Sequence, residues 1–222
     1  MKPIKKASEI IENVKTGSSI MVGGFMVCGH PFTLMEELLK KNVKELTLIT
    51  NDAGFPDKGI GKLIVNGQVK NLIASHIGLN PVAGQKMNSG EMKVELVPQG
   101  TLAERIRAKG AGLGGVLTPT GANTEVEKGK EKFSIEGKDY ILEKPLGAQF
   151  AFIKATIADK NGNCFIAKSA KNFNLVMAMA ADYVVAEVEE IVEVGELDPD
   201  RVTVPGVFVS ALVKSEINEK GF

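Results

Sequence analysis

The chain contains few of the residues that mark disulfide-bonded, metal-binding or membrane-spanning proteins. Its 222 residues include no tryptophan, two cysteines and two histidines. Cys28 and Cys164 lie too far apart in sequence to indicate a disulfide framework or a zinc site, so we expect reduced thiols and no metal. No apolar run approaches the roughly 18 residues of a membrane helix, and no apolar segment follows the basic N-terminus. These absences predict a soluble, cytoplasmic protein that does not bind a membrane.

The chain also lacks an excess of charge of either sign. Lysine and arginine together number 27, and so do aspartate and glutamate. Proteins that bind nucleic acids neutralise phosphates with clustered basic side chains, whereas short clusters here, such as Lys128–Lys132, alternate in sign. The composition therefore argues against nucleic acid as a partner.

Apolar runs alternate with amphipathic segments along the whole chain. At this length, roughly 70% of the unfolded surface can be buried in one domain. Apolar runs without polar alternation predict strands that are buried on both faces. We predict an α/β fold, an open, largely parallel, twisted sheet with helices on both faces, forming a single domain over residues 1–222. The predicted strands are 20–22, 46–49, 71–75, 94–97, 150–153 and 183–186.

The composition of residues around 120–147 differs from that of the rest of the chain and indicates an insertion. Charged residues crowd its first part, and two short β-type segments, 133–135 and 140–142, flank the turn Glu136–Asp139. This pattern predicts a small β-hairpin flap that projects from the domain and is not a second domain.

The stretch Ile20–Leu39 has the pattern of a ligand site. A buried strand is followed by Gly23-Gly24, and Gly29-His30-Pro31 then lead into a helix whose start, Thr33–Glu36, matches a capping box. Glycines let a ligand touch backbone amides, and a helix start offers unpaired donors, so this loop suits an anion or a developing oxyanion. The alternative, that the two glycines only turn the chain, stays open.

Two amide side chains follow predicted strands at what should be the same edge of the sheet. Asn51 comes after one strand, and Gln99 comes after another, just before a second predicted capping box, Thr101–Glu104. Loops at the carboxyl ends of parallel strands bind ligands, and an amide can donate to a carboxylate or carbonyl. A structural role in the turn is the alternative for each. His30 and His76 lack an evident catalytic triad, so we expect both to be structural.

After its first apolar strand the chain carries the pattern Gly23-Gly24-Phe25-x-x-x-Gly29-x-Pro31. This pattern resembles the CoA-binding signature in the α half of the family I, or 3-oxoacid, CoA-transferases, and bacterial acetate or butyrate:acetoacetate enzymes are the most similar members. The chain departs from the family in having Thr16-Gly17 before the strand, and Asn51-Asp52 where two asparagines are frequent. Further stretches that look like this family are 50–54, 98–108 and 168–175.

The resemblance implies a ping-pong transfer of CoA between a short-chain acyl-CoA, such as acetyl-CoA or butyryl-CoA, and a carboxylic acid such as acetoacetate. In the family, a glutamate of the β half attacks the thioester and then carries CoA as a glutamyl thioester. No stretch here looks like that glutamate motif. We therefore expect no catalytic residue on this chain, and activity only with a β subunit, as an α2β2 assembly.

The resemblance also implies which residues meet the substrates. Coenzyme A is then a substrate, and no separate cofactor is expected. Asn51 and Gln99 are expected to line the acyl pocket. The CoA-binding and oxyanion loop is expected to comprise Gly23, Gly24, Phe25, Met26, Val27, Cys28 and Gly29.

Other functions stay open from the sequence. A similar α/β fold could serve a sugar-phosphate isomerase or a ligand-sensing domain, and a non-catalytic scaffold subunit is a further alternative. If the loop contacts a ligand, Gly24→Val should abolish transferase activity while leaving the fold largely intact.

Overall fold

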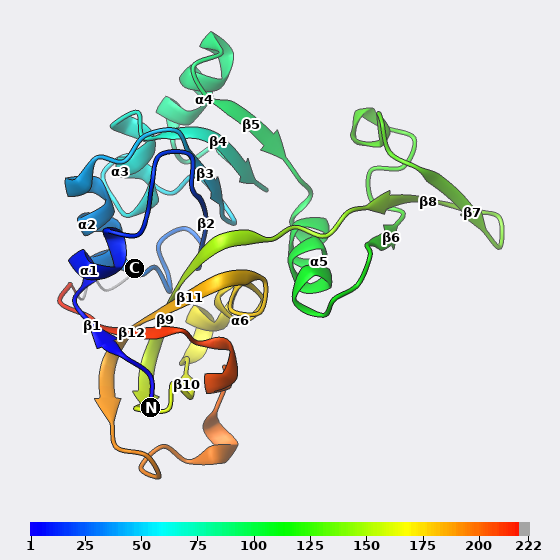
Figure 1. Cartoon of the computed structure of the whole chain (residues 1–222). Helices are drawn as coiled ribbons and strands as arrows, with labels where there is room; N and C mark the ends of the chain where they lie inside the picture. Colours follow the sequence, from blue (N-terminus) through cyan, green and yellow to red (C-terminus); the bar gives the residue numbers. More distant parts are fainter. Residues whose placement is uncertain (218–222) are drawn as a thin grey trace.

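A nine-stranded sheet forms the centre of the fold in the computed structural model, which describes residues 1–217 (Figure 1). Its strand order is β1-β12-β11-β9-β2-β3-β4-β5, with β10 paired to β9. Every pair is parallel except β10 with β9, so the predicted open, largely parallel sheet is confirmed. The strands are β1 (Ile4–Lys5), β2 (Ser19–Val22), β3 (Leu46–Ile49), β4 (Val69–Ala74), β5 (Lys93–Leu96), β9 (Ala148–Asp159), β10 (Cys164–Phe165), β11 (Ala181–Val192) and β12 (Ala211–Lys214).

Strand β2 lies where the strand order changes direction. From β2 the chain adds β3, β4 and β5 on one side, whereas β9, β11, β12 and β1 lie on the other side. In open α/β sheets, ligands bind outside the carboxyl ends of the strands at such a switch point. The loop after β2 therefore occupies the position that this topology favours for a site.

Helices cover both faces of the sheet, as predicted. Helices α1 to α4 pack on one face, where β2 contributes Ile20 and Val22, and α5 and α6 pack on the other face, where β2 contributes Met21. Because β2 is apolar on both faces, it is suited to this central position. No helix among residues 1–217 is both long and apolar enough to span a bilayer. The helices are α1 (Ala7–Ile11), α2 (Phe32–Lys41), α3 (Ile60–Val65), α4 (Pro81–Ser89), α5 (Gln99–Gly110) and α6 (Asn174–Met177).

The predicted capping box at the start of α2 is wrong. The Thr33 hydroxyl accepts the backbone amides of Glu216 (3.0 Å) and Ile217 (3.1 Å) and makes no cap. The Leu34 amide instead donates to Oε2 of Glu187, at 3.1 Å, from strand β11. A carboxylate at a helix N-terminus interacts favourably with the helix dipole. Glu187, which is distant in sequence, therefore accepts an amide at the start of α2 in place of the predicted capping residue.

The second predicted capping box, at the start of α5, is also wrong. Pro98 occupies the position before the helix, and no side chain caps it. Glu104 pairs with Arg107, one turn further along, at 2.6 Å. The buried Thr101 hydroxyl has no hydrogen-bond partner among the described residues. A match to the four-residue capping-box motif therefore did not determine the hydrogen-bond partners of these side chains.

Glu187 belongs to a buried polar cluster that the sequence pattern did not indicate. Strand β11 was predicted to end at residue 186, but it continues to Val192 and carries Glu187 into the core, fully buried. Its Oε1 lies 3.2 Å from Nζ of Lys154 on β9 and accepts the Ser215 hydroxyl at 2.8 Å. Lys154 also donates to Ser215, at 2.6 Å. This cluster links β9, β11 and the start of α2.

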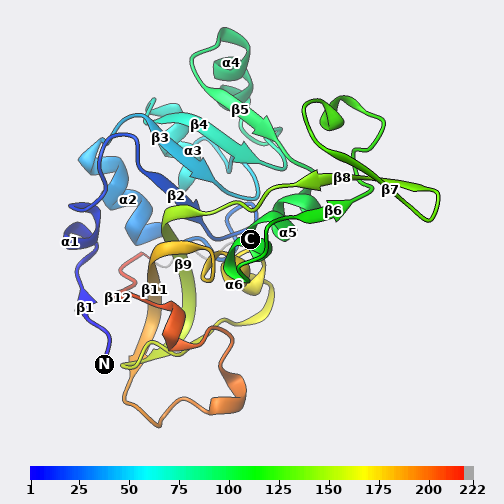
Figure 2. The same ribbon diagram turned by 45° about the vertical axis from the view of Figure 1, so that its right-hand side comes forward.

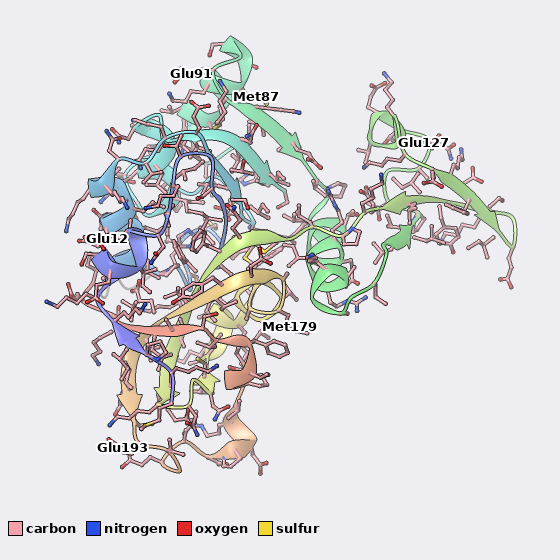
Figure 3. The ribbon with its side chains drawn as sticks, viewed as in Figure 1. Glu12, Met87, Glu91, Glu127, Met179 and Glu193 are labelled. Atoms are coloured by element: carbon pink, nitrogen blue, oxygen red, sulfur yellow. The ribbon has the colours of Figure 1, made fainter. Side chains whose placement is uncertain are left out.

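The predicted flap is present and contains one strand more than the expected hairpin. Strands β7 (Lys132–Ile135) and β8 (Lys138–Glu143) form the antiparallel hairpin. Strand β6 (Val116–Thr118) pairs with β8 on its other side, so the small sheet begins before residue 120. The flap projects away from the main sheet (Figure 2), and Figure 3 shows Glu127, in the 3-10 turn η1 (Glu125–Glu127), on this projecting part.

The flap is held to the main body at its root. Arg105 of α5 bonds through Nη1 to Glu95 (2.7 Å) and through Nε to the backbone oxygen of Lys144 (3.0 Å). The nearly buried carboxylate of Glu143 accepts Lys130 at 2.5 Å. These contacts leave the Arg105 side chain only 12% exposed.

We expect Glu187→Gln to lower the free energy of unfolding by about 3–5 kcal/mol, because it removes the buried carboxylate that faces the buried Lys154 ammonium group. Urea unfolding followed by circular dichroism measures this loss. Glu189→Gln is the matched control, since Glu189 lies 3.8 Å from the same ammonium group but is 48% exposed, and it should cost at most about 1 kcal/mol. Equal losses in the two variants would contradict the importance of the buried pair.

Candidate functional site

Four separated stretches of sequence meet at the carboxyl edge of the main sheet. The loop after β2 contacts Asp52, which follows β3, and Asn174, which begins α6. Asn51, next to Asp52, contacts Gln99 at the start of α5. The four stretches that carry the family resemblance are therefore assembled in one place.

The loop after β2 is a tight turn. Phe25 and Cys28 exchange both backbone hydrogen bonds, at 3.0 and 2.9 Å. Met26, inside this turn, has a φ of 57°, a left-handed conformation that is unfavourable for a residue with a side chain. Its amide donates to Oδ2 of Asp52 at 2.7 Å. The Phe25 side chain is 43% exposed, so the turn presents an apolar side chain to solvent.

Neighbouring side chains occupy the space that Cβ atoms would fill at the two glycines. A Cβ on Gly23 would lie 1.7 Å from Oδ1 of Asn174, and one on Gly24, at a φ of 125°, would lie 1.9 Å from Nδ1 of His30. Gly24→Val would therefore displace His30 as well as alter the loop. The expectation that this substitution leaves the fold largely intact is wrong.

Three backbone amides of the loop have no acceptor within residues 1–217. The Gly23 amide donates to the Phe152 carbonyl at 2.9 Å and extends the pairing of β2 with β9. The amides of Gly24, Val27 and Gly29 donate to no described residue. Gly24 and Val27 are buried, and Gly29 is partly exposed. Because the amides of buried residues normally find a partner, these three are candidate donors for a ligand oxygen.

Asp52 is buried, and three N–H groups converge on its carboxylate. Oδ2 accepts the Met26 amide and Nδ2 of Asn51, both at 2.7 Å, and Oδ1 accepts the Gly54 amide at 2.8 Å. These donors satisfy both carboxylate oxygens in a buried place. The sequence showed Asp52 only as a departure from the family pattern, and its role in holding the loop was missed.

Asn51 and Gln99, which were predicted to lie at the same edge of the sheet, contact each other but differ in exposure. Nε2 of Gln99 donates to Oδ1 of Asn51 at 2.6 Å, and the Ser75 hydroxyl reaches the same oxygen at 3.3 Å. Asn51 is 2% exposed, whereas Gln99 is exposed and lies in the first turn of α5. Asn51 therefore orients Gln99, and solvent reaches Gln99.

His30 packs behind the loop as a neutral, buried ring. It is 2% exposed, it lies against Gly24 and Gly59, and neither ring nitrogen has a hydrogen-bond partner among the described residues. Burial lowers the pKa of His30 to about 4, although the nearby Asp52 carboxylate favours the charged form. The predicted structural role of His30 fits this environment.

The segment before α6 supports the loop from its other side. Nδ2 of Asn174 donates to the Gly29 carbonyl at 3.0 Å, and Nδ2 of Asn172 donates to the Cys28 carbonyl at 3.0 Å. The Ser169 hydroxyl and the Cys28 thiol lie 3.4 Å apart. The only sequence signal for these contacts was that residues 168–175 resemble the family.

The two cysteines differ in exposure: Cys28 is partly exposed, and Cys164 is buried. Both cysteines are free, and burial raises the pKa of the Cys164 thiol to about 12. Among residues 1–217, no cluster of three or more histidine, cysteine, aspartate or glutamate side chains could hold a metal ion.

His30 should make stability depend on pH. The folded protein binds this proton less readily than the unfolded chain, so the contribution is complete above pH 6.5 and is lost as the pH falls toward about 4. The shift in pKa corresponds to about 3 kcal/mol. Urea unfolding of the wild type and of His30→Gln between pH 7.5 and 4 should show a smaller fall in the variant. His76→Gln, at an exposed position, is the matched control and should retain the wild-type fall.

The fold is shared with solved structures of low sequence identity. An acyl-CoA transferase from Escherichia coli, solved as a thioester complex with CoA, superimposes with a TM-score of 0.87 at 23% identity. That match covers all of this chain and 48% of the other, so this chain spans about half its length. Glutaconate coenzyme A-transferase from Acidaminococcus fermentans gives a TM-score of 0.81 at 21% identity, over 95% of this chain and 75% of that chain.

Sequence comparisons are more specific. The chain is 53% identical over 202 residues to the acetate CoA-transferase subunit alpha of Escherichia coli, covering 91% of this chain and 92% of that protein. It is 53% identical over 200 residues to the acetoacetyl-CoA:acetate/butyrate CoA transferase alpha subunit of Clostridium acetobutylicum, covering 90% and 92%. The sequence profile of the family described as Coenzyme A transferase matches residues 4–215. With the resembling stretches assembled at one edge of the sheet, these matches show that the chain belongs to the coenzyme A transferase family.

Proposed function

We propose that this chain is the α subunit of a heteromeric CoA-transferase that moves CoA between a short-chain acyl-CoA and a carboxylic acid such as acetoacetate. A β subunit supplies the glutamate that attacks the thioester and carries CoA as a glutamyl thioester. The substrate names come from the relatives at 53% identity, which are called acetate and acetoacetyl-CoA:acetate/butyrate enzymes. Coenzyme A acts as a substrate, and the reaction needs no resident cofactor.

One observation carries this proposal: in the loop at the switch point, the amides of Gly24, Val27 and Gly29 have no acceptor in the part of the chain that the structure describes. When a carboxylate attacks a thioester, negative charge develops on the thioester oxygen, and preorganised N–H donors stabilise that charge. Gln99, exposed and held by Asn51, is available to a substrate carboxylate or carbonyl. In this proposal the chain binds and orients the reacting groups.

The bonds made by the carboxylates near the loop support the proposal that the nucleophile comes from another chain. Asp52 accepts hydrogen bonds from three N–H groups. Glu187 pairs with Lys154 and accepts the Leu34 amide at the start of α2. Glu36, in α2, pairs with Lys62 at 2.5 Å. A carboxylate engaged in this way is a poor nucleophile, so the attacking group is expected on another chain. An α2β2 assembly remains our proposal for the complex.

CoA exchange should require both subunits. The purified chain should not transfer CoA between butyryl-CoA and acetoacetate, whereas its complex with a β-type subunit should. Borohydride reduction of the complex treated with acyl-CoA should convert a β-subunit glutamate, trapped as its thioester, to the alcohol, which mass spectrometry detects. Full turnover by the isolated chain would refute the division of labour, and an inactive complex would favour the scaffold alternative.

Gln99→Ala should raise the KM for the carboxylic acid by about 10- to 100-fold, because a hydrogen bond to a charged group contributes about 1.5–3 kcal/mol. The KM for acyl-CoA should change less, and the unfolding midpoint should stay near that of the wild type. Gln149→Ala is the matched control, since Gln149 is exposed at the amino end of β9. Unchanged kinetics for every acid tested would remove Gln99 from the acyl pocket.

A further inference from the structure

Each hydrogen-bond partner of the Asp52 carboxylate among residues 1–217 is an N–H donor. The Met26 amide and Nδ2 of Asn51 reach one carboxylate oxygen, and the Gly54 amide reaches the other. An asparagine at position 52 would place its NH₂ group against either Gly54 or the other two donors, whichever way the amide turned. The site as built in this chain therefore requires a carboxylate at position 52.

This carboxylate connects the parts of the proposed site. It holds Met26, the left-handed residue of the turn, so it determines how the neighbouring amides of Gly24 and Val27 are presented. Through Asn51 it also fixes the amide that holds Gln99. One buried anion thus reaches both the amide donors of the loop and the side chain proposed to meet the acid.

We propose that Asp52 is a positioning residue for CoA transfer: its carboxylate locks the turn after β2 through the Met26 amide and aligns Asn51 with Gln99. The proposal rests on the proposed function, because positioning matters only if this loop meets the thioester. Asp52 itself touches no reacting atom in this account. Its donors occupy both carboxylate oxygens, which keeps it from competing as a nucleophile.

Hydrogen exchange tests the anchoring without reference to activity. In the full chain within its complex, the Met26 amide should exchange more slowly than the Val27 amide, for which residues 1–217 provide no acceptor. Asp52→Asn should speed exchange at Met26 by about 10-fold or more. The wild-type comparison stands even if the variant folds poorly. Equal exchange at Met26 and Val27, or protection at Met26 that survives Asp52→Asn, would overturn the anchoring.

Steady-state kinetics of the complex test the consequence for transfer. Asp52→Asn should lower kcat by about 10- to 100-fold, since small misplacements of oriented groups have effects of this size, and should change the KM for acyl-CoA by less than about 3-fold. Asp159→Asn is the matched control. Asp159 is 4% exposed and accepts two bonds from Asn163 in the turn between β9 and β10, so it tests the loss of a buried carboxylate elsewhere.

Failure of the positioning role can be distinguished from failure of the proposed function. A wild-type kcat in Asp52→Asn with an unprotected Met26 amide would overturn the positioning role. An equal loss of kcat in Asp159→Asn would also overturn it, because general destabilisation would then explain both variants. A wild-type complex that exchanges no CoA, while Met26 protection still depends on Asp52, would overturn the proposed function and leave the anchoring in place.

Discussion

The site depends on one buried carboxylate that receives three N–H groups. Asp52 follows β3, yet it holds Met26 of the loop after β2, and through Asn51 it reaches Gln99 on α5. A buried carboxylate is costly unless hydrogen bonds surround it, so these bonds are mutually dependent. The turn keeps a left-handed residue because this arrangement over-determines it.

The other buried polar groups near the loop follow the same physical rule. Glu187 is tolerated in the core because Lys154, Ser215 and the start of α2 satisfy it. Burial keeps the His30 ring neutral, and the ring packs against Gly24. The sequence suggested that the start of α2 could bind an anion, but Glu187 of this chain accepts the Leu34 amide there. The donors left for a ligand lie in the turn itself.

Membership of the coenzyme A transferase family gives these donors a chemical context. The sheet places the turn at the switch point, between β9 and β3, and the helices close both faces behind it. In the proposed reaction this chain supplies amide donors and an orienting glutamine, and a partner supplies the carboxylate. Such a division fits the carboxylates described near the loop, each of which is engaged in hydrogen bonds or an ion pair.

The sequence by itself determined the fold class, the family and the four stretches that make the site, because apolar runs such as Ile20–Val22 and local glycine patterns are encoded within a few residues. The hairpin of the flap was predicted for the same reason. Only the tertiary structure decided the surroundings of Asp52, His30, Glu187 and Asn174. Each of these side chains is defined by a partner that is distant in sequence or by burial, and neither property can be recognised from neighbouring residues alone.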